Sequence, residues 1–287
     1  MGKKLPRLAL VIGSGGLKCA AAIGVMQVLE AENIAVDMVV GCSGGAIFGS
    51  LIAMGFSAEK IESTRKQTWT NKVAKKLDLR SLGKIVFPRL VGFSDEIGIF
   101  DDSVMSESIT RAVGRETTFA DTKVPFYCIA TDFHTGKPVI ISEGNLARAV
   151  RISSGIPIVY KPVDWNGRLM IDGGLSNPLP VDVAIQEGAN IIIAVGFETP
   201  LLPSVSSPGN YASQMFNILV NQLLYKQFAF YNLAYHSEII PIVPEFSISI
   251  KISDVSSVPF IIEQGRLESL RHISYLKKML DPLNLET

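Results

Sequence analysis

A serine between glycines is the group in this sequence best suited to chemistry. Residues 41–45 read Gly-Cys-Ser-Gly-Gly and fit the Gly-x-Ser-x-Gly pattern, in which small neighbours allow a sharp turn that presents the serine hydroxyl. A serine hydroxyl becomes nucleophilic when a base accepts its proton and hydrogen-bond donors await the oxyanion. The pattern therefore predicts that Ser43 is a nucleophile and that Gly41 and Gly45 shape the turn around it.

Asp172 is the candidate base. It ends the run from Arg168 to Ile171 and is followed by two glycines. We expect that run to be a strand parallel to the one before Ser43, so that its end carries the carboxylate to the same edge of the sheet, within reach of the hydroxyl. An aspartate that begins a turn can also serve only as a cap, and its pairing with the serine turn favours the base.

A second glycine-rich segment could supply the oxyanion donors. Residues 13–16 read Gly-Ser-Gly-Gly and follow the apolar run of residues 8–12, so the backbone N–H groups of Gly13, Ser14, Gly15 and Gly16 form a candidate oxyanion hole. The rival interpretation is a dinucleotide loop. That loop needs a glycine at position 18, where the sequence has Lys18.

Histidine offers a competing mechanism. The chain has three histidines, His134, His236 and His272. His236 follows Ser43 and Asp172 in the Ser, Asp, His order of α/β hydrolases, so a conventional triad stays open as an alternative. His134 lies in a polar turn, where we expect a surface role.

The surrounding pattern predicts the elements that position these groups. Residues 8–12 and 36–40 are apolar runs, each followed by a glycine loop and a helical stretch, which is typical of a parallel sheet. Further strands are expected at 125–131, 138–141, 168–171, 191–195 and 239–243, and helices at 146–152 and 258–280. We predict one domain over residues 1–287, with a three-layer α/β/α fold around a mostly parallel sheet. Residues 83–98 could be a loop or a lid.

The composition narrows the classes of partner and cofactor. Lys+Arg and Asp+Glu both number 27, so no net charge attracts nucleic acid. The three cysteines lack metal-ligand spacing, and we expect reduced thiols, no metal, no cofactor and a cytoplasmic protein. No apolar run is long enough to span a bilayer. The aromatic run of residues 215–231 could pack in the core, or form a surface for transient membrane contact or for a second subunit.

Taken in order, residues 13–18, residues 41–45 and Asp172-Gly173-Gly174 resemble the motifs of the patatin-like phospholipase family, as do residues 130–132 with 135–138 and residues 151–157. The resemblance implies a patatin-like fold, a Ser43/Asp172 dyad without a catalytic histidine, an oxyanion loop over residues 13–16 and a lipid or other acyl ester as substrate. Ser14 and Cys19 stand where the family has glycines, and Lys18 takes a position that is basic in the family. A weakly active or inactive regulatory protein on this fold is the alternative from another functional class.

Overall fold

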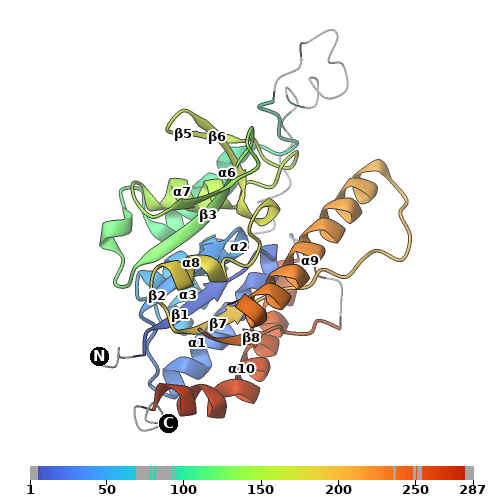
Figure 1. Cartoon of the computed structure of the whole chain (residues 1–287). Coiled ribbons are helices and arrows are strands. Elements are labelled where there is room, and N and C mark those ends of the chain that lie inside the picture. Colours follow the sequence, from blue (N-terminus) through green and yellow to red (C-terminus); the bar gives the residue numbers. More distant parts are fainter. Residues whose placement is uncertain are drawn as a thin grey trace.

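The structure, a computed structural model, describes residues 6–68, 78, 81, 92, 95–234, 237–247, 250 and 254–281. A mixed sheet lies at its centre (Figure 1). Its described strands lie side by side in the order β5 (Val163–Trp165), β6 (Arg168–Asp172), β3 (Phe126–Asp132), β2 (Met38–Cys42), β1 (Leu8–Ile12), β7 (Ile191–Val195) and β8 (Glu238–Ile242), and β4 (Pro138–Ile141) also pairs with β3. Neighbours from β3 to β8 in this order are parallel.

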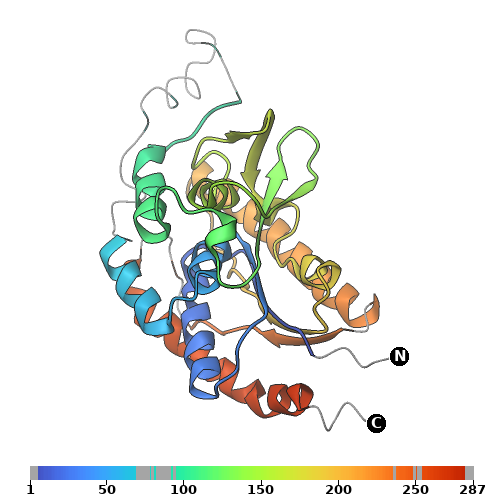
Figure 2. The same ribbon diagram turned by 90° about the vertical axis from the view of Figure 1, so that its left-hand side faces the viewer.

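Helices cover both faces of the sheet, as Figure 2 shows with the two helical layers on opposite sides. One face carries α1 (Ala21–Ala31), α2 (Gly44–Ala53), α3 (Ala58–Thr68), α6 (Asp102–Val113), α7 (Leu146–Ser153) and α10 (Val258–Leu280), and the other carries α8 (Val181–Gln186) and α9 (Pro208–Ala234). Strand β1 serves both layers because alternate side chains point to opposite faces. Leu10 and Ile12 pack in the hydrophobic core between the sheet and the α1, α2 and α10 layer. Val11 packs in the core on the opposite face, beneath α8 and α9. The α/β prediction is confirmed.

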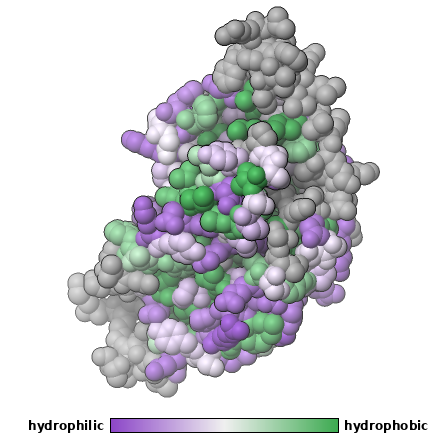
Figure 3. Space-filling view, turned by 90° about the vertical axis from the view of Figure 1, so that its right-hand side faces the viewer, coloured by the Kyte–Doolittle hydropathy of each residue, from purple (hydrophilic) through white to green (hydrophobic). Residues whose placement is uncertain are grey.

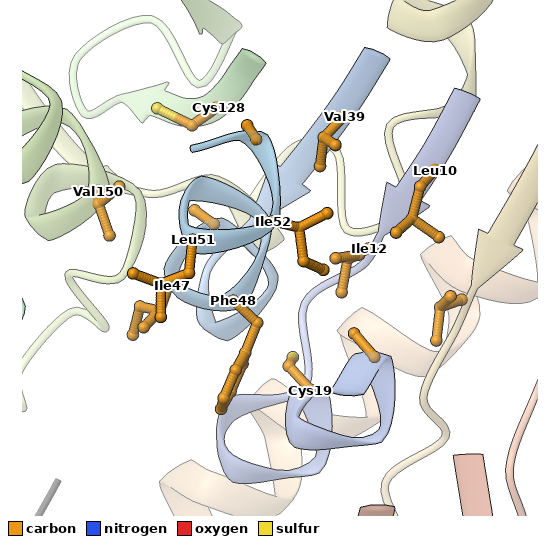
Figure 4. Packing of buried hydrophobic residues seen from close by; sticks show 14 of the residues in the cluster. Leu10, Ile12, Cys19, Val39, Ile47, Phe48, Leu51, Ile52, Cys128 and Val150 are labelled. Atoms are coloured by element: carbon orange, nitrogen blue, oxygen red, sulfur yellow. The ribbon is translucent and has the colours of Figure 1, made fainter. Parts of the chain in front are cut away.

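Helix α2 is buried along its whole length. Figure 4 shows Ile52 pointing toward Val39 of β2 and Ile12 of β1, and Ile47 and Leu51 pointing toward Val150 of α7. A helix that is apolar on all sides belongs in a protein interior. The helix that begins at the candidate nucleophile is therefore fixed by packing on several sides.

The strand that carries Asp172 runs opposite to the predicted direction. Strand β6 pairs antiparallel with β3, so the prediction that it is parallel to the strand before Ser43 was wrong. The register explains why the two groups still meet. Cys42 pairs with Ile129 of β3, and Asp172 pairs with Ala130, the next residue. Strand β3 extends past the end of β2, and β6 returns along that extension to bring Asp172 beside the serine turn.

Local pattern located most elements but missed short ones. Strands β4 and β7 and helix α10 have the predicted bounds, whereas β5 and α8 were not predicted. Most of residues 83–98, the candidate lid, lie outside the described residues. Within the described ranges, no helix is both long enough and apolar enough to cross a bilayer.

Candidate active site

The turn at Ser43 has the strained geometry expected of a nucleophile elbow. Ser43 lies between β2 and α2 with φ 56° and ψ −126°, a region that residues other than glycine seldom adopt. The start of α2 also presses against the loop after β1. A Cβ atom on Gly44 would lie 2.2 Å from the carbonyl oxygen of Gly16, and one on Gly45 would lie 2.1 Å from that of Ile12. Glycines at these positions therefore let the elbow and the neighbouring loop come into contact.

The structure brings the two predicted catalytic residues together. The Ser43 hydroxyl donates a hydrogen bond to Asp172 Oδ2 at 2.7 Å, and the two residues are only 4% and 1% exposed. The other carboxylate oxygen, Oδ1, accepts from the backbone N–H of Gly174 at 2.8 Å. Each oxygen of the carboxylate thus has one donor, which leaves Asp172 oriented toward the serine proton.

Burial changes the acidity of this carboxylate. It raises the pKa of Asp172 from 3.8 to about 6, while the hydrogen bonds from Ser43 and Gly174 and the charge of Arg151 act in the opposite direction. Desolvation disfavours the charged form of an acid, and donors favour it. At neutral pH most of the carboxylate is therefore ionised, yet it is a stronger base than a carboxylate in water.

Two serines at the end of α7 hold the elbow in place. Ser153 Oγ accepts from the N–H of Ser43 at 3.0 Å and donates to the carbonyl of Ile129 at 2.6 Å. Ser154 Oγ donates to the carbonyl of Ser43 at 3.0 Å. These two serines were not predicted as site residues, because nothing in their spacing or residue type connects them to Ser43. The signal that could have found it is the occurrence of two adjacent hydroxyls at the end of an otherwise buried helix.

The loop after β1 contributes fewer free donors than predicted. The N–H of Gly13 donates to the carbonyl of Val195 at 2.9 Å, and that of Ser14 donates to the carbonyl of Pro178 at 2.7 Å. These two bonds fix the loop to its neighbours. Within the described part of the chain, no acceptor pairs with the N–H groups of Gly15 and Gly16. The candidate oxyanion donors are therefore Gly15 and Gly16, and Gly13 and Ser14 position them.

Lys18 anchors the other end of this loop. Its buried ammonium donates to the carbonyl oxygen of Glu198 at 2.8 Å and to Thr199 Oγ1 at 2.7 Å. Burial lowers the pKa of Lys18 to about 8. The loop is thereby tied to the segment that follows β7, a contact that the sequence did not reveal.

The cysteines around the site are unsuited to nucleophilic catalysis. Burial raises the pKa of Cys19, Cys42 and Cys128, so the thiols stay protonated and poorly reactive. Among the described residues, no three His, Cys, Asp or Glu side chains form a group that could hold a metal ion.

The two histidines among the described residues lie on elements other than those that carry Ser43 and Asp172. His134 is exposed in the turn between β3 and β4, as predicted. His272 lies on α10 and contacts Glu268. His236, the candidate for a conventional triad, lies outside the described residues.

Comparisons with known proteins show the family to which the chain is similar. The family model described as patatin-like phospholipase matches residues 10–185, a range that includes the loop after β1, the elbow and Asp172. An uncharacterized NTE family protein of Mycobacterium tuberculosis is 30% identical over 220 residues, which is 76% of this chain and 57% of that protein. Patatin-like phospholipase domain-containing protein 6 of Homo sapiens is 31% identical over 192 residues, which is 66% of this chain.

The chain spans little more than half of the mycobacterial relative and 13% of the human one. Among solved structures, that of VipD from Legionella pneumophila is similar with a TM-score of 0.52 at 11% identity, covering 95% of this chain and 67% of that one. A likeness at this identity concerns the fold alone.

Proposed function

The chain belongs to the patatin-like phospholipase family, and we propose that it is a serine acyl hydrolase that cleaves acyl esters of lipids, with Ser43 as nucleophile and Asp172 as base. The observation that supports the proposal most directly is the 2.7 Å hydrogen bond from the serine hydroxyl to a buried carboxylate. A nucleophile within hydrogen-bond reach of an oriented base is the arrangement that covalent catalysis requires.

The proposed reaction has two halves. As Ser43 Oγ attacks the ester carbonyl carbon, its proton passes to Asp172 Oδ2, and the N–H groups of Gly15 and Gly16 stabilise the oxyanion. The tetrahedral intermediate then releases the alcohol, which takes the proton from Asp172, and an acyl ester remains on Ser43. Water next attacks this ester while Asp172 accepts one of its protons, and the carboxylic acid leaves as Ser43 regains a proton.

The direct contact between the dyad residues argues against a conventional triad. In a triad a histidine lies between the serine and the acid, whereas here the Ser43 hydroxyl already bonds to the carboxylate and the second carboxylate oxygen bonds to Gly174. The intact dyad likewise favours an enzyme over an inactive regulatory protein. The proposed mechanism therefore needs no histidine.

The pH dependence of the reaction follows from the pKa of Asp172. The base must be ionised, and its pKa is about 6, so kcat/KM is expected to fall about tenfold per pH unit below pH 6 and to level off above it. The measurement is the pH profile of kcat/KM on a neutral p-nitrophenyl ester, corrected for hydrolysis without enzyme. A profile that stays flat to about pH 4.5 would remove Asp172 from the role of base.

A lipid panel tests the proposed function itself. We expect the wild-type chain to release fatty acid from at least one class among phospholipids, lysophospholipids and neutral glycerides, and to be labelled by a fluorophosphonate. Fatty-acid release by mass spectrometry and intact-mass analysis of the labelled chain measure the two results. Labelling without lipid hydrolysis would point to a water-soluble acyl ester as substrate, and the absence of both would favour the regulatory protein.

A further inference from the structure

Helix α9 exposes an apolar stripe on its outer side. Tyr211, Met215 and Leu219 are 60%, 50% and 63% exposed, and their four-residue spacing places them on one face of the helix. Leu201 and Val205, in the segment before the helix, are also exposed. Figure 3 views the side of the molecule that carries α9 and shows hydrophobic residues gathered across its middle. Large apolar side chains exposed near one another in this way are typical of a site of interaction.

The stripe lies on a projecting part of the molecule that is hydrogen-bonded to the segment before it. Figure 1 shows the N-terminal half of α9 extending away from the sheet. Side chains of the helix form hydrogen bonds with the segment before it. The Gln214 amide bonds both the N–H and the carbonyl of Leu202, and the Asn221 amide bonds both groups of Thr199. We call residues 199–234 the prong.

The prong carries almost no charge. Between Glu198 and Lys226 the sequence has no Asp, Glu, Lys, Arg or His, although 19% of the whole chain is Asp, Glu, Lys or Arg. Protein interfaces use charged groups to set orientation and partner choice. A lipid surface places the opposite demand on a protein, since charged side chains that enter it are costly and apolar ones with tyrosines at the boundary are favoured.

The base of the prong shares its anchors with the candidate oxyanion loop. Lys18, next to that loop, donates a hydrogen bond to the side chain of Thr199. The backbone of the same threonine is hydrogen-bonded to the Asn221 amide. On the other side, Gln227 of α9 accepts from the N–H of Leu179 and donates to Asn177, next to the Pro178 carbonyl that receives the N–H of Ser14. The base of the prong is therefore tied by hydrogen bonds to the loop that adjoins the Ser43 elbow.

We propose that the prong docks on a lipid surface through its uncharged apolar face and holds the active site at that surface. This inference rests on the proposed function, because a lipid hydrolase must reach acyl chains that are aggregated in water. The anchors described above make the prong preorganised for docking, so little order has to be gained on binding.

Vesicle flotation of variants that introduce negative charge tests the proposal. We expect the wild type to float with phosphatidylcholine vesicles at low and high salt alike, because an apolar contact is not screened by ions. The Met215→Glu/Leu219→Glu variant should bind at least about tenfold more weakly and hydrolyse vesicle lipid correspondingly more slowly. Its hydrolysis of a soluble p-nitrophenyl ester should be unchanged, which also reports that the variant is folded. The matched control is Leu267→Glu/Leu270→Glu on α10, where both residues are similarly exposed.

Other outcomes would overturn the proposal. These are no flotation of the wild type, equal losses in both double variants, flotation that high salt abolishes, or a wild-type dimer that the α9 variant dissociates while vesicle binding stays intact. Ser43→Ala protein should float like the wild type. Flotation without hydrolysis of any ester would refute the proposed function and leave docking standing, whereas hydrolysis of soluble esters without flotation would refute docking alone.

Discussion

Ser43→Ala is expected to lower kcat/KM for ester hydrolysis by at least about 10⁴-fold, because removal of the nucleophile leaves only binding and oxyanion stabilisation. Fluorophosphonate labelling should disappear with it. The fold should survive, since Asp172 is the one hydrogen-bond partner of Ser43 Oγ among the residues that the structure describes. Initial rates and intact-mass analysis measure the effect, with Ser142→Ala, a change at an exposed serine, as the control that keeps full activity. Appreciable labelling of the Ser43→Ala protein would place the nucleophile elsewhere.

Ser43→Gly adds a stability readout to the same position. The backbone of Ser43 has φ 56°, where glycine carries no steric penalty. The glycine variant should be as inactive as the alanine variant but more stable by about 1 kcal/mol. Chemical denaturation of the two variants measures the difference. Equal stabilities would mean that the elbow relaxes when the hydroxyl is removed.

Asp172→Asn is expected to abolish activity and to raise stability. An asparagine can keep both hydrogen bonds, accepting from Gly174 and donating to Ser43, but it cannot take a proton, so a rate loss of about 10⁴-fold is expected. The rise of the Asp172 pKa from 3.8 to about 6 corresponds to roughly 3 kcal/mol that the buried charge costs the folded state. The variant lacks that cost and should be more stable by about 1–3 kcal/mol near pH 8.

The sign of this stability effect depends on pH. Because the folded protein binds the Asp172 proton more tightly than the unfolded chain does, the cost is absent below about pH 4, grows as the pH rises toward 6 and is complete above it. Urea unfolding of the wild type and Asp172→Asn near pH 8 and near pH 4 measures it. A variant less stable than the wild type near pH 8 would show that the charge is compensated by its surroundings.

Local sequence patterns predicted the strands and helices that have a clear apolar run or a clear helical periodicity. The apolar run of residues 191–195, short and rich in isoleucine, favoured a buried strand, and the periodicity of residues 258–280 predicted α10. The direction of β6 was predicted wrongly because pairing direction depends on β3, which is remote in sequence. Helix α8, with six residues, is too short for its period to stand out.

The sequence predicted which residues form the candidate site, but it did not predict the hydrogen bonds between the site and its surroundings. The glycine spacing singled out Ser43, and the pairing of that turn with Asp172-Gly173-Gly174 singled out Asp172 although the expected strand direction was wrong. The structure places the two side chains in contact. Which amides of the glycine loop stay free depends on Val195 and Pro178, which occupy the amides of Gly13 and Ser14. No local pattern contains that information. The run of residues 215–231 was predicted either to pack in the core or to form an exposed surface. It does both, since Leu224 is buried and Leu219 is exposed.

The antiparallel return of β6 also has a consequence for how the protein is made. Ser43 and Asp172 are 129 positions apart in the chain, so a nascent polypeptide that has emerged through β3 contains the whole elbow but no carboxylate to serve it. Closing so long a loop is a late and entropically costly event in folding. If Ser43 and Asp172 act as proposed, we expect acylation of Ser43 only after β6 has paired with β3, so the rate at which a refolding chain gains reactivity toward a fluorophosphonate would report the rate of that pairing.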